Sequence, residues 1–134
     1  NPLDPPNRSV DGPAVNHITN DARRFARGEK LWRTDTRLLI SGRSLGWSST
    51  AFKTMARNRK PAFLRQFKTP LFVGTSEQEL LVDNAAHDYV LSHVQNGQGK
   101  RYPGAKHELV MELDATREAF LADVDTFYHS VLEA

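Results

Sequence analysis

The apolar run at residues 71–74, Leu-Phe-Val-Gly, constrains the fold of this chain more than any other segment. A short, continuous apolar run is typical of a strand that is buried on both faces of a parallel sheet. The other candidate strands are also short, at residues 38–40 and 100–102. Two or three such strands do not form a stable parallel sheet alone, so the first run needs neighbours along both edges. The sequence therefore predicts that the chain is part of a larger α/β domain.

The second half of the sequence alternates strand and helix signals. After the strand at 71–74, Asp83 or Asn84 can cap a helix, and the segment Asn-Gly-Gln-Gly at 96–99 is predicted to end it. A brief strand follows, and Asp114 opens the last helix. This order of strand, helix, strand and helix is the final part of a βαβα winding.

The first half of the sequence predicts helices. Thr19 or Asn20 can cap a helix that runs to about Trp32. In this helix the apolar residues share one face, and the Arg and Lys residues lie elsewhere. Ser48 or Ser49 can cap a second helix. We therefore expect a mainly helical region ahead of the apolar strand.

Charge divides the sequence into two unlike halves. Residues 1–70 hold 14 Lys and Arg against 5 Asp and Glu, whereas residues 71–134 hold 4 against 11. The two halves then carry net charges of +9 and −7, and one interpretation is that they attract each other across solvated surfaces. The other is a non-enzymatic module whose basic half binds an anionic partner such as a membrane surface. Nucleic acid is disfavoured, because the sequence has neither a zinc motif nor aromatic residues interleaved with its Arg residues.

The sequence also excludes several classes of protein. It contains no Cys, which rules out a disulfide scaffold and a thiol nucleophile. No run of about 18 apolar residues could span a membrane, and the first residues lack the features of a secretory signal. We therefore expect a cytoplasmic protein, peripheral to membranes at most. His87 and His93 lie six residues apart, which does not place two ligands on one helix face, so no metal or cofactor is expected.

Two predicted loops follow the strands and carry groups able to move a proton. The first loop contains Glu79, and the second contains His107. Parallel α/β sheets place reactive groups at such strand ends, and a carboxylate beside a His is the acid and base of a Ser-His-acid relay. The order, acid before His, is that of α/β-hydrolases. The other interpretation, that His107 is an ordinary polar loop residue, stays open.

Four segments carry a family resemblance. They are Thr-Pro-Leu-Phe-Val-Gly at 69–74, Glu-Leu-Leu-Val-Asp-Asn at 79–84, Tyr-Pro-Gly-Ala-Lys-His-Glu-Leu at 102–109, and Arg117 before the last helix. Together they resemble the C-terminal part of the lysophospholipase and monoacylglycerol-lipase-like α/β-hydrolases. The resemblance implies that Glu79, four residues before Asp83, holds the position of the acid and that His107 holds that of the base. Many members of the family have Asp where this chain has Glu79, and Glu also serves the relay.

The resemblance also implies an organisation and a chemistry. Residues 1–68 are expected to form a mainly helical cap or lid segment, and residues 69–134 the C-terminal βαβα part of an α/β-hydrolase core. The expected substrate is a lipid-like carboxylic ester, with Trp32 and Trp47 of the cap in contact with it. The serine nucleophile is expected outside this chain, in an N-terminal half of the same enzyme. No cofactor is implied.

A second candidate for the nucleophile lies within the chain. The segment Gly-Arg-Ser-Leu-Gly at 42–46 matches the G-x-S-x-G elbow, and Ser44 precedes Glu79 and His107 in the required order. A small, self-contained esterase would use Ser44. Two features speak against it. The following helix is predicted to begin only at Ser48 or Ser49. Glu79 lies 35 positions after Ser44, and residues 50–68 within that stretch carry no strand signal.

Overall fold

A computed structural model describes residues 16–38 and 44–133, without the side chains of Trp32 and Thr36. In chain order the elements are α1 (Ala22–Thr34), the 3-10 turn η1 (Thr36–Leu38), α2 (Leu45–Asn58), α3 (Pro61–Leu64), β1 (Leu71–Ser76), α4 (Asn84–Leu91), β2 (Gly97–Tyr102), the 3-10 turn η2 (Leu109–Met111) and α5 (Asp114–Leu132). The candidate strand at 38–40 falls mostly outside the described residues, and its first residue ends η1. The described residues form helices and one two-stranded parallel sheet, which is compatible with part of an α/β fold.

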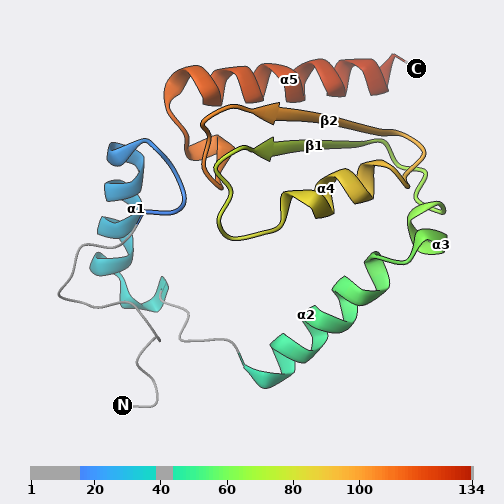
Figure 1. The fold of residues 1–134 in the computed structure, drawn as a ribbon. Helices are drawn as coiled ribbons and strands as arrows, with labels where there is room; N and C mark the ends of the chain where they lie inside the picture. The colour runs from blue at the N-terminus through green and yellow to red at the C-terminus, as the bar shows by residue number, and fades with distance from the viewer. Residues whose placement is uncertain (1–15, 39–43, 134) are drawn as a thin grey trace.

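The sheet consists of the two strands predicted in the second half of the sequence. β1 and β2 run parallel, from Leu71 opposite Gly97 to Ser76 opposite Tyr102. α4 connects them and lies on one face of the sheet, whereas α5 lies on the other face (Figure 1). Because parallel strands end at the same edge of a sheet, the loops that follow β1 and β2 start side by side.

The face under α5 holds the aromatic core of the described residues. The ring centre of Phe72 lies 5.7 Å from that of Phe127 and 6.4 Å from that of Phe120. Tyr102 meets Phe120 edge-on at 5.6 Å, and its hydroxyl donates to Asp123 Oδ2 at 2.7 Å. Burial, together with that carboxylate, raises the pKa of Tyr102. These contacts attach α5 to the sheet along its apolar stripe.

The face under α4 depends on two glycines that the sequence prediction misplaced. The segment 96–99 does not end the helix, because α4 ends at Leu91 and Gly97 and Gly99 lie in β2. A Cβ atom at Gly97 would lie 2.5 Å from a methyl carbon of Val94, and one at Gly99 would lie 2.5 Å from a methyl carbon of Leu91. Glycine is therefore placed here because the end of α4 passes very close to the strand.

The cap of α1 lies one or two residues after the two predicted positions. The cap is Asp21, whose carboxylate accepts from the backbone N–H groups of Arg23 and Arg24. The predicted cap Thr19 is fully buried, and its hydroxyl donates instead to the carbonyl oxygen of Met111 at 2.6 Å. The hydroxyl oxygen also accepts from Asp21 N at 2.9 Å, so Thr19 holds the cap residue in place while Asp21 caps the first turn.

α2 begins earlier than predicted. Its cap is Ser44, whose Oγ accepts from Trp47 N at 3.1 Å, so the prediction of Ser48 or Ser49 was wrong. Both later serines lie inside the first two turns. A serine at any of these positions satisfies the capping rule, and the hydrophobic pattern alone did not distinguish them.

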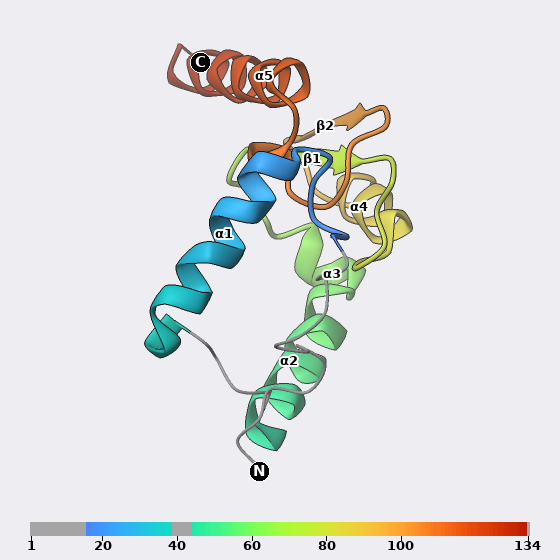
Figure 2. The same ribbon diagram turned by 90° about the vertical axis from the view of Figure 1, so that its left-hand side faces the viewer.

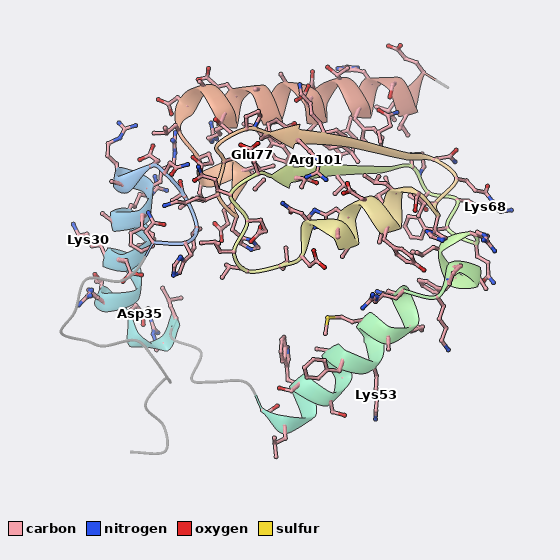
Figure 3. All side chains as sticks on the ribbon, viewed as in Figure 1. Lys30, Asp35, Lys53, Lys68, Glu77 and Arg101 are labelled. Carbon is pink, nitrogen blue, oxygen red and sulfur yellow. The ribbon has the colours of Figure 1, made fainter. Side chains whose placement is uncertain are left out.

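α1 and α2 extend away from the sheet on the side of α4 in both views (Figures 1 and 2). The described side chains of α2 are not deeply buried. Leu45 is 90% exposed, and Phe52 is 68% exposed. Figure 3 shows Lys53 pointing away from the rest of the chain. α2 therefore presents apolar side chains that the described residues leave uncovered.

Candidate active site

The loops after β1 and β2 are joined to each other by hydrogen bonds at the carboxyl edge of the sheet. Glu77 N donates to the carbonyl oxygen of Tyr102 at 3.2 Å, and Gln78 N donates to that of Ala105 at 2.8 Å. In return, Gly104 N donates to Glu77 Oε2 at 2.8 Å. Gly104 has a φ of 69°, a conformation that glycine adopts at little cost. In Figure 3, the label of Glu77 shows where this edge of the sheet lies.

These two loops bring Glu79 and His107 into direct contact. The Nδ1 atom of His107 lies 2.7 Å from Oε2 of Glu79. The Glu79 side chain is 4% exposed, whereas that of His107 is 32% exposed. The carboxylate is thus enclosed, while part of the imidazole faces solvent. The two residues lie 28 positions apart in sequence and meet because parallel strands end together.

The carboxylate of Glu79 is also held by its own loop. Its Oε1 atom accepts from Leu81 N at 2.6 Å and from Val82 N at 3.3 Å. Burial raises the pKa of Glu79, but the hydrogen bonds from Leu81, His107 and Val82 together outweigh burial, so the pKa lies below its ordinary value. Glu79 is therefore ionised at neutral pH, which leaves it able only to accept hydrogen bonds.

An ionised Glu79 determines which nitrogen of His107 carries the proton. Nδ1 must donate to the carboxylate, since a carboxylate has no hydrogen to offer. In the neutral imidazole, Nε2 is then the lone-pair nitrogen and can take a proton. Within residues 16–38 and 44–133, Glu79 is the hydrogen-bond partner of the His107 ring. The pair has the geometry of a proton acceptor oriented by a carboxylate.

Glu112, a buried carboxylate that the sequence did not point to, holds the backbone next to His107. Glu112 is 1% exposed, and its Oε1 atom accepts from Lys106 N at 2.8 Å, next to His107 in the chain. The residue after His107 is held as well, because Glu108 N donates to the carbonyl oxygen of Ile18 at 2.9 Å. The signal available in the sequence was a lone acidic residue inside the otherwise apolar stretch 109–113, Leu-Val-Met-Glu-Leu.

The structure does not bring Ser44 to this pair. Ser44 has φ −67° and ψ 153°, an ordinary extended conformation for a helix cap, whereas a nucleophile elbow is a strained turn. α2 starts at the end that lies away from the sheet in both views (Figures 1 and 2). The expectation that α2 starts only after Trp47 was wrong, so that objection to Ser44 falls. The backbone conformation of Ser44 and the position of α2 still argue against Ser44 as the nucleophile.

Of the two tryptophans proposed to contact substrate, only Trp47 has its side chain in the described part of the structure. Trp47 lies in the first turn of α2, and its side chain is 57% exposed. The side chain of Trp32 lies outside the described part of the structure.

Within the residues that are described, none of the helices is both long enough and apolar enough to cross a bilayer.

Comparison with known proteins relates this chain to one kind of enzyme. No protein-family model matches the sequence. The proteins named lysophospholipase L2 in Escherichia coli strain K12 and in an Escherichia coli O6:H1 strain are each 26% identical to this chain over 123 residues. The match covers 87% of this chain and 36% of each relative, so the chain spans about a third of the length of the curated relatives it matches. Most of this chain is therefore similar to one part of these two lysophospholipases.

Proposed function

We propose that this chain supplies the acid and the general base of a carboxylic ester hydrolase of the lysophospholipase type, which uses a Ser-His-acid mechanism. The observation that carries the proposal is the 2.7 Å contact between His107 Nδ1 and a buried Glu79 carboxylate at the ends of two parallel strands. The similarity to two proteins named lysophospholipase L2 supports the substrate class. The earlier expectation of an α/β-hydrolase core becomes part of the same proposal.

The roles follow from the protonation of the pair. A serine hydroxyl outside this chain attacks the acyl carbonyl of the ester, and Nε2 of His107 takes the hydroxyl proton as the new C–O bond forms. The imidazolium then gives that proton to the oxygen of the leaving alcohol as the old C–O bond breaks. Water, deprotonated by the same nitrogen, then bonds to the acyl carbon; the bond from that carbon to the serine oxygen breaks, and the imidazolium returns the proton to the serine oxygen. Glu79 keeps Nδ1 protonated throughout and stabilises the imidazolium between the two transfers.

The proposal assigns parts of the chain to two regions of the enzyme. Residues 69–134 belong to the core, and residues 1–68 form the cap or lid. A lysophospholipid or monoacylglycerol carries one acyl chain, and exposed apolar side chains of α2 such as Trp47 and Phe52 offer it a surface. The N-terminal half of the same enzyme is the expected partner of this chain.

Labelling with a fluorophosphonate, which reacts with activated serines, tests the proposal. We expect no label on the 134-residue chain alone, and a labelled serine outside residues 1–134 in the longer protein that contains it. His107→Ala in that protein should abolish both label and ester hydrolysis, since the hydroxyl loses its base. His93→Ala, which changes a His in the turn after α4, is the matched control and should keep both.

Two results would overturn the assignment. Full ester hydrolysis by His107→Ala would remove His107 from the mechanism. A label on Ser44 of the isolated chain, lost in Ser44→Ala, would establish the self-contained esterase in its place.

A second candidate function is binding of an anionic membrane surface, and one observation favours it. Residues 36–76 contain eight Lys and Arg but no Asp or Glu. Within this stretch α2 exposes Leu45, Phe52 and Met55. An apolar helix surface flanked by cations is the pattern of a helix that lies in the interface of an anionic bilayer.

Vesicle sedimentation tests this second candidate. We expect the chain to bind vesicles that contain phosphatidylglycerol, to bind pure phosphatidylcholine weakly, and to lose binding as salt rises. The double change Phe52→Ser and Met55→Ser should abolish binding, whereas Leu121→Ser with Leu132→Ser on α5 should not. Binding that ignores both lipid charge and the α2 changes would eliminate this function.

A further inference from the structure

Glu112 is a buried ionisable residue to which the proposed mechanism assigns no part. It lies between η2 and α5 and is 1% exposed. Its Oε1 atom accepts from Lys106 N at 2.8 Å, from Asn20 N at 3.0 Å and from Asn20 Nδ2 at 3.2 Å. Its Oε2 atom accepts from Leu113 N at 3.1 Å. Four N–H groups therefore converge on one enclosed carboxylate.

These donors come from three segments, and the one before α1 is far from the other two in sequence. Asn20 precedes α1, Lys106 belongs to the turn after β2, and Leu113 precedes α5. Asn20 and Glu112 are separated by 92 positions. A carboxylate with several acceptor sites can serve all three segments at once, which neither a hydroxyl nor a single carbonyl oxygen can do.

The segment before α1 braces the turn that carries His107 through further contacts. Asn20 Nδ2 donates to the carbonyl oxygen of Gly104 at 2.8 Å, and Lys106 Nζ donates to that of Asn16 at 3.0 Å. On the other side of His107, Glu108 N donates to the carbonyl oxygen of Ile18 at 2.9 Å. The chain is thus fixed immediately before and immediately after His107.

The same cluster reaches the first turn of α1. Arg24 Nη1 donates to the carbonyl oxygen of Glu112 at 2.6 Å and also pairs with Asp21, the cap of α1. Arg24 Nη2 pairs with Asp114 at the start of α5. The placement of α1 is therefore coupled, through Arg24 and Glu112, to the backbone beside His107.

We propose that Glu112 is a positioning residue that holds His107 against Glu79 and couples this pair to the placement of α1. The inference rests on the proposed function, because only a hydrolase uses the pair to move a proton. A change in the placement of α1 would act on His107 through Asn20, Arg24 and the hydrogen bond from Lys106 N to Glu112.

Histidine-selective ¹⁵N labelling of the 134-residue chain tests the positioning role without any need for activity. The ¹⁵N shifts of His107, assigned by their loss in His107→Ala, report which ring nitrogen carries the proton. In the wild type we expect the Nδ1–H tautomer that the Glu79 contact requires. In Glu112→Ala we expect a mixture with the Nε2–H tautomer, together with about tenfold faster hydrogen exchange of the Lys106 amide.

Two further variants and a control separate positioning from loss of stability. Glu112→Gln keeps one acceptor oxygen, so its tautomer should stay close to that of the wild type. Asn20→Ala changes an exposed residue and should reproduce a partial shift even if Glu112→Ala does not fold. Phe127→Ala removes packing against Phe72 without touching the turn at 104–108, and it should leave the tautomer unchanged.

The outcomes distinguish this inference from the proposed function. A wild-type tautomer in both Glu112→Ala and Asn20→Ala overturns the positioning role of Glu112. An equal shift in Phe127→Ala overturns it too, since general loosening would then explain the effect. Tautomer shifts as expected, with ester hydrolysis that does not depend on His107 in the longer protein, would instead keep the coupling and overturn the proposed role of His107 as the base.

Discussion

At the scale of single residues, the chemistry of the site depends on how Glu79 is kept ionised inside the protein. An enclosed carboxylate without donors would tend to take up a proton. Here Leu81 and Val82 donate to one oxygen and His107 to the other, so the charged form is favoured. The cause is local: the loop after β1 folds back so that its own N–H groups point at the side chain.

This arrangement predicts a specific dependence of stability on pH. Because the folded pKa of Glu79 lies below its ordinary value of 4.5, the native state binds fewer protons than the unfolded state near that pH. The contribution of Glu79 to stability is therefore fully present above pH 4.5 and is lost as the pH falls through the lower folded pKa. Urea denaturation at neutral pH and in this acid range should show that the free energy of unfolding falls less with acid in Glu79→Gln than in the wild type.

The control for this measurement is Glu118→Gln, which changes an exposed carboxylate on α5. It should follow the wild type, because an exposed carboxylate contributes little to stability at either pH. If acid lowers the free energy of unfolding equally in Glu79→Gln and the wild type, the carboxylate is not stabilised as the contacts suggest.

At the scale of elements, the close approach of α4 to β2 gives glycine a packing role. In Gly97→Ala the new Cβ would lie 2.5 Å from a methyl carbon of Val94. Val is stiff about χ1, so the turn after α4 or the start of β2 must shift, and we expect a loss of about 1–3 kcal/mol in the free energy of unfolding. Gly28→Ala on α1 meets nothing within 4 Å and should instead stabilise by up to about 1 kcal/mol. Urea denaturation measures both, and equal effects would argue against the packing explanation.

The start of α2 gives a second prediction at this scale. Ser44→Ala removes the acceptor for Trp47 N and should cost about 1 kcal/mol of local helix stability. Because none of the described side chains of α2 is buried, we expect faster amide exchange in its first turn rather than a lower melting temperature. Ser44→Asp should restore the cap, and Ser49→Ala, at a residue first predicted as a cap, should have little effect. Slower or unchanged exchange at Trp47 in Ser44→Ala would contradict this cap.

Several local features were predicted, whereas residues with distant partners were assigned wrongly. Asp83 caps α4 and Asp114 is the first residue of α5, as predicted. The cap of α2 is also local, but it was predicted wrongly because several serines in this segment satisfy the same rule. The prediction of Thr19 as a cap was wrong: Asp21 caps α1, and the Thr19 hydroxyl accepts from Asp21 N and donates to the carbonyl oxygen of Met111, 92 positions away. The glycines of β2 were read as a helix end for the same reason: only the nearby α4 side chains reveal their purpose.

At the scale of the whole molecule, the apolar core is small for the number of apolar side chains. Among the described residues, Leu64, Tyr102, Ala105 and Leu109 are the buried hydrophobic ones, whereas 15 large hydrophobic side chains are exposed. Exposed apolar surface on this scale marks a surface that another molecule or segment covers. This distribution agrees with the prediction, made from the strand at 71–74, that the chain belongs to a larger α/β domain.

The small core predicts low stability for the isolated chain. We expect a free energy of unfolding below about 5 kcal/mol, the lower end of the range for natural domains. The chain should also bind the dye ANS while its far-ultraviolet circular dichroism stays helical. Urea denaturation and dye fluorescence check both expectations. A higher stability without dye binding would mean that the exposed side chains cover one another in solution.

By itself, the sequence determined the features that depend on neighbouring residues: the two parallel strands, the helices between and after them, and the placement of Glu79 and His107 in the two loops after those strands. The tertiary structure decided the rest. The 2.7 Å contact of the pair and the hydrogen bond from Asn20 to Glu112 join residues far apart in sequence, and the ionised state of Glu79 depends on the first of these contacts together with hydrogen bonds from its own loop. Such contacts depend on the path of the whole chain, and burial and hydrogen-bond geometry leave no periodic pattern in a sequence by which to find them.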